Sequence, residues 1–180
     1  MRDESIPLKL NAAEAVAKGL RLRGRVPVAE LPRLSEALTS PEGELQAESE
    51  FSEDPQSLGR LQGRLQTTVV LTCQRCLQPL PWPLELRPDL SLVATEEDEE
   101  RLLDRCEPVR LEAGMLMLRD ALEDELLLGL PLAPTCADPA CAQRPPSPGE
   151  TTAPQVSDNV RPGDSRPNPF LALKGKFPTR

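Results

Sequence analysis

Hydrophobic and polar residues alternate along three consecutive stretches in the middle of the chain. In residues 44–52, hydrophobic residues such as Leu45 and Phe51 alternate with glutamate, glutamine and serine. The same period of two continues over 60–73 and 83–94. A period of two places one face of a strand in a core and the other in water, which is typical of antiparallel sheets. We therefore predict three strands over these ranges that form an antiparallel meander.

Helical spacing replaces the alternation on both sides of these strands. Over residues 115–130 the hydrophobic positions recur every three or four residues, and the acidic residues 123–125 fall on the opposite, solvent-facing side. Near the N-terminus, Asn11 is a good N-cap for a short helix over 12–20. A hydrophobic helix stripe is buried most simply against the apolar face of a sheet. The predicted fold class is therefore α+β, an antiparallel β-meander packed by one main C-terminal helix and a short N-terminal helix.

Prolines and charges suggest the structure of three further segments. The sequence Val-Pro-Val at 26–28 predicts an edge strand, because proline cannot donate a hydrogen bond within an inner ladder. Residues 32–43 contain turn signals, ending in Ser-Pro-Glu-Gly. Five consecutive acidic residues at 96–100 predict a solvated loop.

Composition divides the chain into three parts. The strands, helices and cysteines predict a domain over residues 1–141. Residues 142–166 contain five prolines and few large apolar residues, which predicts a flexible linker. A basic C-terminal motif follows at 167–180, with Asn168, Pro169 and Phe170 near its start.

Charge is distributed unevenly along the chain. The net charge is −8, yet residues 42–125 carry eight basic and twenty acidic side chains. An acidic body binds phosphate backbones poorly, so any RNA contact is expected at the basic ends. The N-terminal candidates form a basic cluster, whose alternative interpretation is the solvated face of a helix and a strand. This cluster comprises Lys18, Arg21, Arg23 and Arg25.

The hydropathy of the chain bears on its location. No stretch approaches the roughly 18 apolar residues of a membrane span. The N-terminal sequence also lacks the apolar core of a secretion signal. We therefore expect a cytoplasmic protein.

Four of the five cysteines form two pairs. Cys73 and Cys76 have the spacing C-x2-C at a strand end, and Cys136 and Cys141 have the spacing C-x4-C beyond the predicted helix. Four thiolates are a complete tetrahedral ligand set for structural Zn²⁺, with no open position for catalysis. The alternative is that these are ordinary unmetallated thiols. A redox C-x2-C motif lacks its usual βαβ context here, and Cys106 is expected to be an unpaired thiol.

The chain lacks the residues on which most active sites depend. It contains no histidine and no tyrosine, which removes Ser-His and Cys-His nucleophile arrangements. No glycine-rich phosphate-binding loop is present. We therefore expect a protein that is not an enzyme, with a metal-dependent nuclease as the alternative that clustered carboxylates leave open.

Three blocks of sequence together resemble the YceD-like family. The first is Val-Val-Leu-Thr-Cys-Gln-Arg-Cys-Leu at 69–77, followed by Pro79. The second joins the acidic helix around 123–125 to the second cysteine pair, and the third is Arg-Pro-Asn-Pro-Phe-Leu-Ala-Leu at 166–173. Their order and approximate spacing match over most of residues 5–175.

The resemblance implies a role in the accumulation of large-subunit (23S) ribosomal RNA, with the precursor large ribosomal subunit as the partner. It implies no catalytic mechanism. Members of the family vary at the four sulfur positions, and the C-x4-C pair of this chain is looser than the pair in many of them. A zinc-clipped adaptor with partners unrelated to ribosomes is a third alternative.

The C-terminal motif is the main candidate for partner binding. Its prolines favour an extended backbone, which lowers the entropic cost of docking. Its apolar side chains are expected to anchor in a groove while its lysines meet phosphates. The alternative is that the tail packs against its own domain. The candidate residues are Asn168, Pro169, Phe170, Leu171, Lys174 and Lys176.

Overall fold

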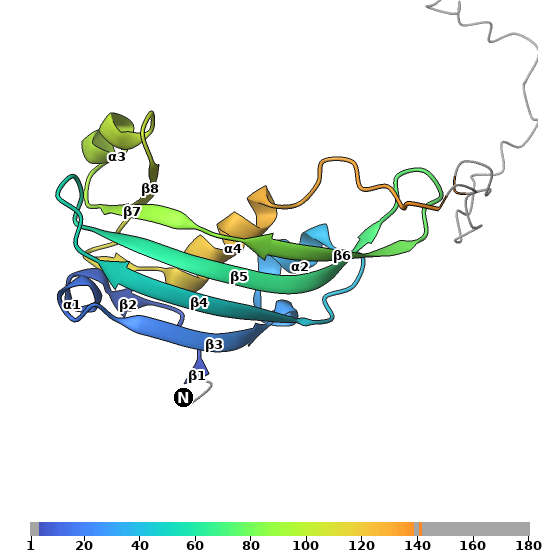
Figure 1. Cartoon of the computed structure of the whole chain (residues 1–180), viewed down its shortest axis with the longest axis horizontal. Coiled ribbons are helices and arrows are strands. Elements are labelled where there is room, and N and C mark those ends of the chain that lie inside the picture. The colour runs from blue at the N-terminus through green and yellow to red at the C-terminus, as the bar shows by residue number, and fades with distance from the viewer. Residues whose placement is uncertain (1–3, 139–140, 142–180) are drawn as a thin grey trace, which may run out of the picture. The chain divides into compact units, whose positions relative to one another are not determined.

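A mostly antiparallel sheet organises the protein in the computed structural model, which describes residues 4–138 and residue 141 (Figure 1). The strand order is β1-β3-β4-β5-β7-β8, and β6 also pairs with β5. A separate pair of short strands, β2 and β9, lies outside this sheet. The strands are β1 (Glu4–Ser5), β2 (Leu10–Asn11), β3 (Arg21–Pro27), β4 (Glu44–Ser52), β5 (Gly59–Thr72), β6 (Pro79–Leu86), β7 (Asp89–Val93), β8 (Glu107–Arg110) and β9 (Met115–Leu116).

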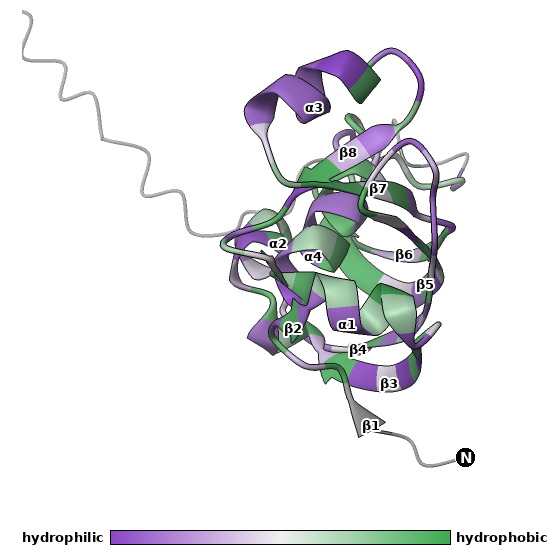
Figure 2. Cartoon of the chain, turned by 90° about the vertical axis from the view of Figure 1, so that its left-hand side faces the viewer, coloured by the Kyte–Doolittle hydropathy of each residue, from purple (hydrophilic) through white to green (hydrophobic). Residues whose placement is uncertain are grey.

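The helices α1, α2 and α4 cover one face of the sheet, where the core lies, whereas α3 lies beside β8 (Figure 2). The helix α1 packs on β4 and β5, while α4 packs on β6 and on α2. The stripe of α4 is fully buried at Leu118, Leu122 and Leu126, as is Phe51 of β4. The α+β prediction is therefore confirmed. The helices are α1 (Ala12–Ala17), a 3-10 turn η1 (Val28–Glu30), α2 (Pro32–Ala37), α3 (Glu96–Leu102) and α4 (Leu118–Leu128).

The long strand β5 holds the sheet together because it has partners along its whole length. It pairs with β4 on one side, and with β7 and then β6 on the other. The prediction of a single strand over 83–94 is wrong. The strand is interrupted at Arg87 and Pro88, which separate β6 from β7. At this break, the amide of Gly63 donates to the carbonyl of Pro88 at 3.0 Å.

The edge of β6 that does not face β5 carries alternating prolines. Pro79, Pro81 and Pro83 lie opposite Thr72, Val70 and Thr68 of β5. Successive residues of a strand direct their N–H groups to opposite edges. The residues between the prolines therefore make the hydrogen bonds to β5. At the other edge of β6 the three prolines present carbonyl acceptors but no N–H donors.

The predicted bounds of the N-terminal and the C-terminal helix differ from the structure by a few residues. The cap of α1 is confirmed, because the Asn11 side chain accepts from the amide of Glu14 at 2.9 Å. This helix ends at Ala17 rather than at residue 20, just before Gly19 adopts a φ of +54°. The C-terminal helix begins at Leu118, because residues 115 and 116 instead pair with β2.

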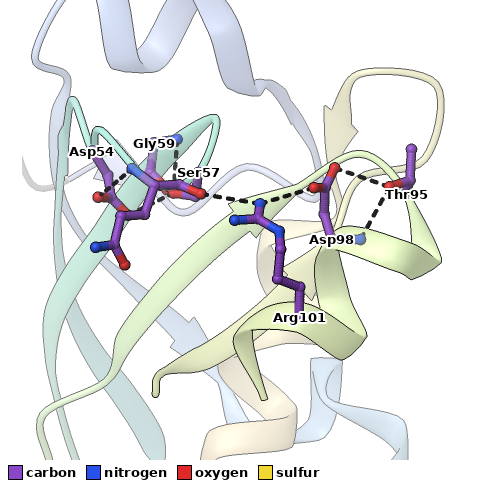
Figure 3. A network of polar contacts seen from close by, with 7 residues as sticks. Asp54, Ser57, Gly59, Thr95, Asp98 and Arg101 are labelled. Carbon is purple, nitrogen blue, oxygen red and sulfur yellow. Dashed lines mark hydrogen bonds and ion pairs between the residues drawn. The ribbon is translucent and has the colours of Figure 1, made fainter. Parts of the chain in front are cut away.

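The predicted loop at 96–100 is wrong, because these residues begin α3. The Thr95 side chain accepts from the amide of Asp98 at 3.2 Å and caps the helix. The first turn also contains four acidic residues, whose negative charges interact favourably with the positive end of the helix dipole. Arg101 of α3 bonds to Asp98 and to the carbonyl of Gln56, which joins α3 to the loop before β5 (Figure 3).

Two segments in the N-terminal third match their predictions in part. Val26 and Pro27 end β3, beyond the two residues of β3 that pair with β1, whereas Val28 begins η1. Residues 32–43 contain a helix as well as turns, because α2 occupies their first half with Pro32 in its first turn. Proline suits the first turn of a helix, where its missing N–H would have no partner.

Glu123 is buried, although the helical pattern places it on the solvent side of α4. Its carboxylate accepts from the backbone amide of Leu34 at 2.9 Å and from the Arg33 guanidinium at 3.1 Å. The N-cap residue of α2, Leu31, makes no side-chain capping bond. Glu123 therefore caps α2 from another helix and joins α2 to α4.

The described residues all lie in the first of the two units into which the chain divides, residues 1–147. The predicted linker at 142–166 and the motif at 167–180 lie outside the described residues. None of the helices in the described part of the chain has the length and hydrophobicity that a membrane crossing requires.

Candidate metal centre

The first cysteine pair lies in the turn that joins β5 to β6. The amide of Cys73 donates to the carbonyl of Gln78 at 2.9 Å, and the amide of Leu77 donates to the carbonyl of Cys73 at 2.9 Å. Leu77 adopts a φ of +56°, which lets the chain turn back sharply after Cys76. These backbone bonds direct both thiols of the pair toward the same side.

The second cysteine pair follows α4 and reaches the same end of the sheet. The amide of Gln74 donates to the carbonyl of Pro134 at 2.8 Å, which joins the two cysteine segments through their backbones. A second bond runs from the backbone amide of Cys136 to the side-chain sulfur of Cys73 at 3.3 Å. The two pairs, which lie 60 residues apart in sequence, therefore meet at one end of the sheet.

All four sulfur atoms lie within 4.8 Å of one another. The Cys73 and Cys141 sulfurs are 3.6 Å apart, and those of Cys76 and Cys136 are 3.9 Å apart. Tetrahedral coordination at a Zn–S distance of about 2.3 Å separates neighbouring sulfurs by about 3.8 Å. The two closest approaches between the pairs therefore match a tetrahedral ligand set, and the group could hold a metal ion.

Burial distinguishes the four ligands from one another. Cys73, Cys76 and Cys141 are buried and make a small cluster of their own, separate from the main core. Cys136 is only half-buried and, like Leu80, packs against this cluster. With four protein ligands, a bound ion has no position left for water or substrate, so the chemistry of this site is structural.

The surroundings affect the thiols in opposite directions. Backbone hydrogen bonds, the strongest from Cys76 and the next from Cys136, lower the pKa of Cys73 to about 5. A hydrogen bond with Cys136 and then burial raise the pKa of Cys141 to about 12, while the charge of Arg75 opposes this rise. One thiolate therefore forms readily, but four buried thiolates together require a cation.

Cys106, the remaining cysteine, is not part of this group. Its thiol lies 3.6 Å from the carbonyl of Leu102 at the end of α3. It is only partly buried.

The predicted basic cluster is already paired with acidic residues. Lys18 contacts Glu14 within α1, and the three arginines lie in β3 beside glutamates of β4. Arg23 lies 3.2 Å from Glu48, for example. Pairing reduces the charge that these side chains offer to a phosphate. The ion pairs are Arg21–Glu50, Arg23–Glu48 and Arg25–Glu44.

The predicted residues of the C-terminal motif lie outside the described residues. Reasoning from sequence also missed two residues of the metal centre. Gln74 and Arg75 both contact the second cysteine segment. Their position between the two cysteines of a C-x2-C pair was the available signal, because such residues necessarily lie beside the ligands.

Comparison with known proteins identifies relatives of the whole chain. Residues 61–175 match the family model described as "Large ribosomal RNA subunit accumulation protein YceD". The protein of that name from Haemophilus influenzae is 31% identical over 176 residues, which cover 96% of this chain and 97% of that protein. No solved structure matches the chain. The family match and the relative agree, and the chain belongs to the YceD family of large ribosomal RNA subunit accumulation proteins.

Proposed function

We propose that this protein supports the accumulation of large-subunit ribosomal RNA by binding the precursor large subunit, without being an enzyme. The observation that carries the proposal is the similarity to the Haemophilus influenzae protein along nearly the entire chain. Because the alignment covers nearly all of both proteins and not one domain alone, it supports a role that the two proteins share. We place this role in the cytoplasm.

The non-enzymatic part of the proposal rests on the chemistry of the described residues. The chain has no histidine. The potential metal-ligand group found in the described part of the chain consists of four cysteines, which fill a tetrahedral shell. Many carboxylates of the sheet are paired with arginines, such as Asp89 with Arg60. Such pairs suit a scaffold better than a catalytic centre.

We further propose that Zn²⁺ occupies the cysteine site and ties the β5–β6 turn to the segment after α4. The sulfur spacing and the four-thiolate donor set both support zinc. In this role the ion stabilises the end of the sheet. It activates no water.

For the contact with the precursor subunit, we propose the C-terminal motif as the principal element. Phe170 and Leu171 would supply apolar anchors, Asn168 and Pro169 an extended backbone, and Lys174 and Lys176 the charge that meets phosphates. The basic cluster of Lys18 and the β3 arginines would contribute less, because acidic neighbours already neutralise it.

Two measurements test this function. In a strain that lacks the protein, we expect less large-subunit rRNA relative to small-subunit rRNA, and an unchanged ratio contradicts the proposal. In a sucrose gradient, the tagged protein should sediment with large-subunit precursors, and added salt should weaken this association if basic residues contribute.

A matched pair of variants tests the tail. Phe170→Ala should reduce co-sedimentation, whereas Phe177→Ala removes the same side chain outside the proposed anchor and should leave it unchanged. Purified protein should not cleave precursor rRNA. Cleavage that a single carboxylate substitution abolishes would instead establish a nuclease.

A further inference from the structure

Arg75 occupies a special position beside the metal centre. It lies between Cys73 and Cys76 in the first cysteine turn and is exposed at the surface. Its guanidinium Nη2 donates to the backbone carbonyl of Cys136 at 2.6 Å. The turn that carries the first pair of ligands therefore holds the backbone of a ligand in the second pair.

Cys136 is the ligand that most needs such support. It is the least buried of the four cysteines. It also lies in the segment after α4, which forms no helix or strand up to residue 138. The backbone bonds from Gln74 and Cys136 fix the direction of this segment, and Arg75 adds a charged side-chain bond at the ligand itself. Hydrogen bonds from charged donors are stronger than those between neutral groups.

Charge gives Arg75 a second way to act on the site. Four thiolates around one divalent cation leave two negative charges in excess. Because Arg75 donates to the carbonyl of Cys136, its positive charge lies beside this cluster. A nearby cation therefore stabilises the metal-bound thiolates as well as the position of Cys136.

We propose that Arg75 is a positioning residue of the metal centre, which holds Cys136 through its carbonyl and offsets the negative charge of the thiolate shell. This inference rests on the proposed zinc site. It predicts that Arg75 sets how tightly the ion is bound and how slowly it leaves, while the fold of the metal-free protein is independent of it.

The test is zinc binding by the full chain under reducing conditions, measured by competition with a chromophoric chelator. Arg75→Ala should weaken zinc binding by about 10- to 100-fold, the usual effect of removing a group that supports a ligand. Release of zinc to the chelator should become faster. The thermal unfolding of the metal-free protein should not change, which separates positioning from a general structural role.

Three further variants sharpen the result. Arg75→Lys keeps the charge and Arg75→Gln keeps a donor, so their zinc affinities show which property matters. Arg87→Ala removes an exposed arginine from the link after β6 and serves as the matched control. Equal zinc affinity in Arg75→Ala and Arg87→Ala overturns the proposed role of Arg75 but leaves the proposed zinc site standing. Absence of zinc from the reduced wild-type protein overturns the metal centre and this inference with it.

Discussion

The two ends of β5 are joined to later parts of the chain by different kinds of contact. At its start, the preceding loop meets α3 through the exposed side chain of Arg101 and the carbonyl of Gln56 (Figure 3). At its end, the turn into β6 meets Pro134 through a backbone bond and Cys141 through a buried thiol. Water competes for the first contact and is excluded from the second. Both ends are held close, but only the end with cysteines should contribute strongly to stability.

The largest effect is expected from Cys73→Ser at the buried end. Loss of one thiol of the proposed zinc site should abolish zinc binding and with it the stability that the ion would supply. That contribution is about 4 kcal/mol when free zinc exceeds its dissociation constant 1,000-fold. Metal analysis and chemical unfolding with and without zinc measure both effects. Cys106→Ser is the control, because this thiol lies outside the cluster, and an equal loss in both variants would contradict the assignment of ligands.

A smaller loss is expected from Glu123→Ala, which extends the comparison to the centre of the fold. This change leaves the amide of Leu34 without its buried partner, at a cost of about 1–3 kcal/mol. Asp124→Ala removes only an exposed contact to Arg33 and should cost less than about 1 kcal/mol. Urea unfolding of the two variants compares them directly. Similar midpoints would show that burial does not decide the strength of these contacts.

The pH dependence of stability provides an intermediate test at Glu125. Burial, followed by the charge of Glu107, raises the pKa of this carboxyl from 4.5 to about 7. Between these values the folded protein holds a proton that the unfolded chain has released. Stability should therefore fall as the pH rises from about 4.5 to 7, and the loss should persist above that range. Glu125→Gln should flatten this part of the pH profile in urea unfolding, whereas the exposed variant Glu100→Gln should retain it.

The smallest effect is expected from Arg101→Ala at the exposed end. Since solvent screens its contacts, the overall unfolding midpoint should barely move. Amide exchange should become faster locally, in the loop at 54–58 and in α3. A large drop in the unfolding midpoint would remove the proposed difference between the two ends of β5.

The sequence predicts those strands and helices whose position depends on the local pattern of hydrophobic residues. The alternation over 44–52 gives the bounds of β4, and the hydrophobic stripe of α4 is buried as expected. The charged run at 96–100 is helical because Thr95 caps it, and a count of charges alone does not reveal this cap. The burial of Glu123 has no local signal, since its partner Leu34 lies 89 residues away in sequence.

At the candidate site, too, the sequence predicts the local spacing but not the long-range contacts. The C-x2-C and C-x4-C spacings single out the four thiols that lie together in the structure, but they leave open whether these thiols hold a metal. Spacing does not reveal the bond from Arg75 to the carbonyl of Cys136, which depends on how the segment after α4 is folded. The C-terminal motif remains a prediction.

The prolines of β6 bear on how the protein behaves at high concentration. An unpaired strand invites other extended chains to add themselves to a sheet, which is a route to domain swapping and fibril growth. Each added chain needs donors as well as acceptors from the strand that it joins. Pro79, Pro81 and Pro83 offer it only acceptors, so this margin of the sheet should resist self-association even while newly made protein accumulates.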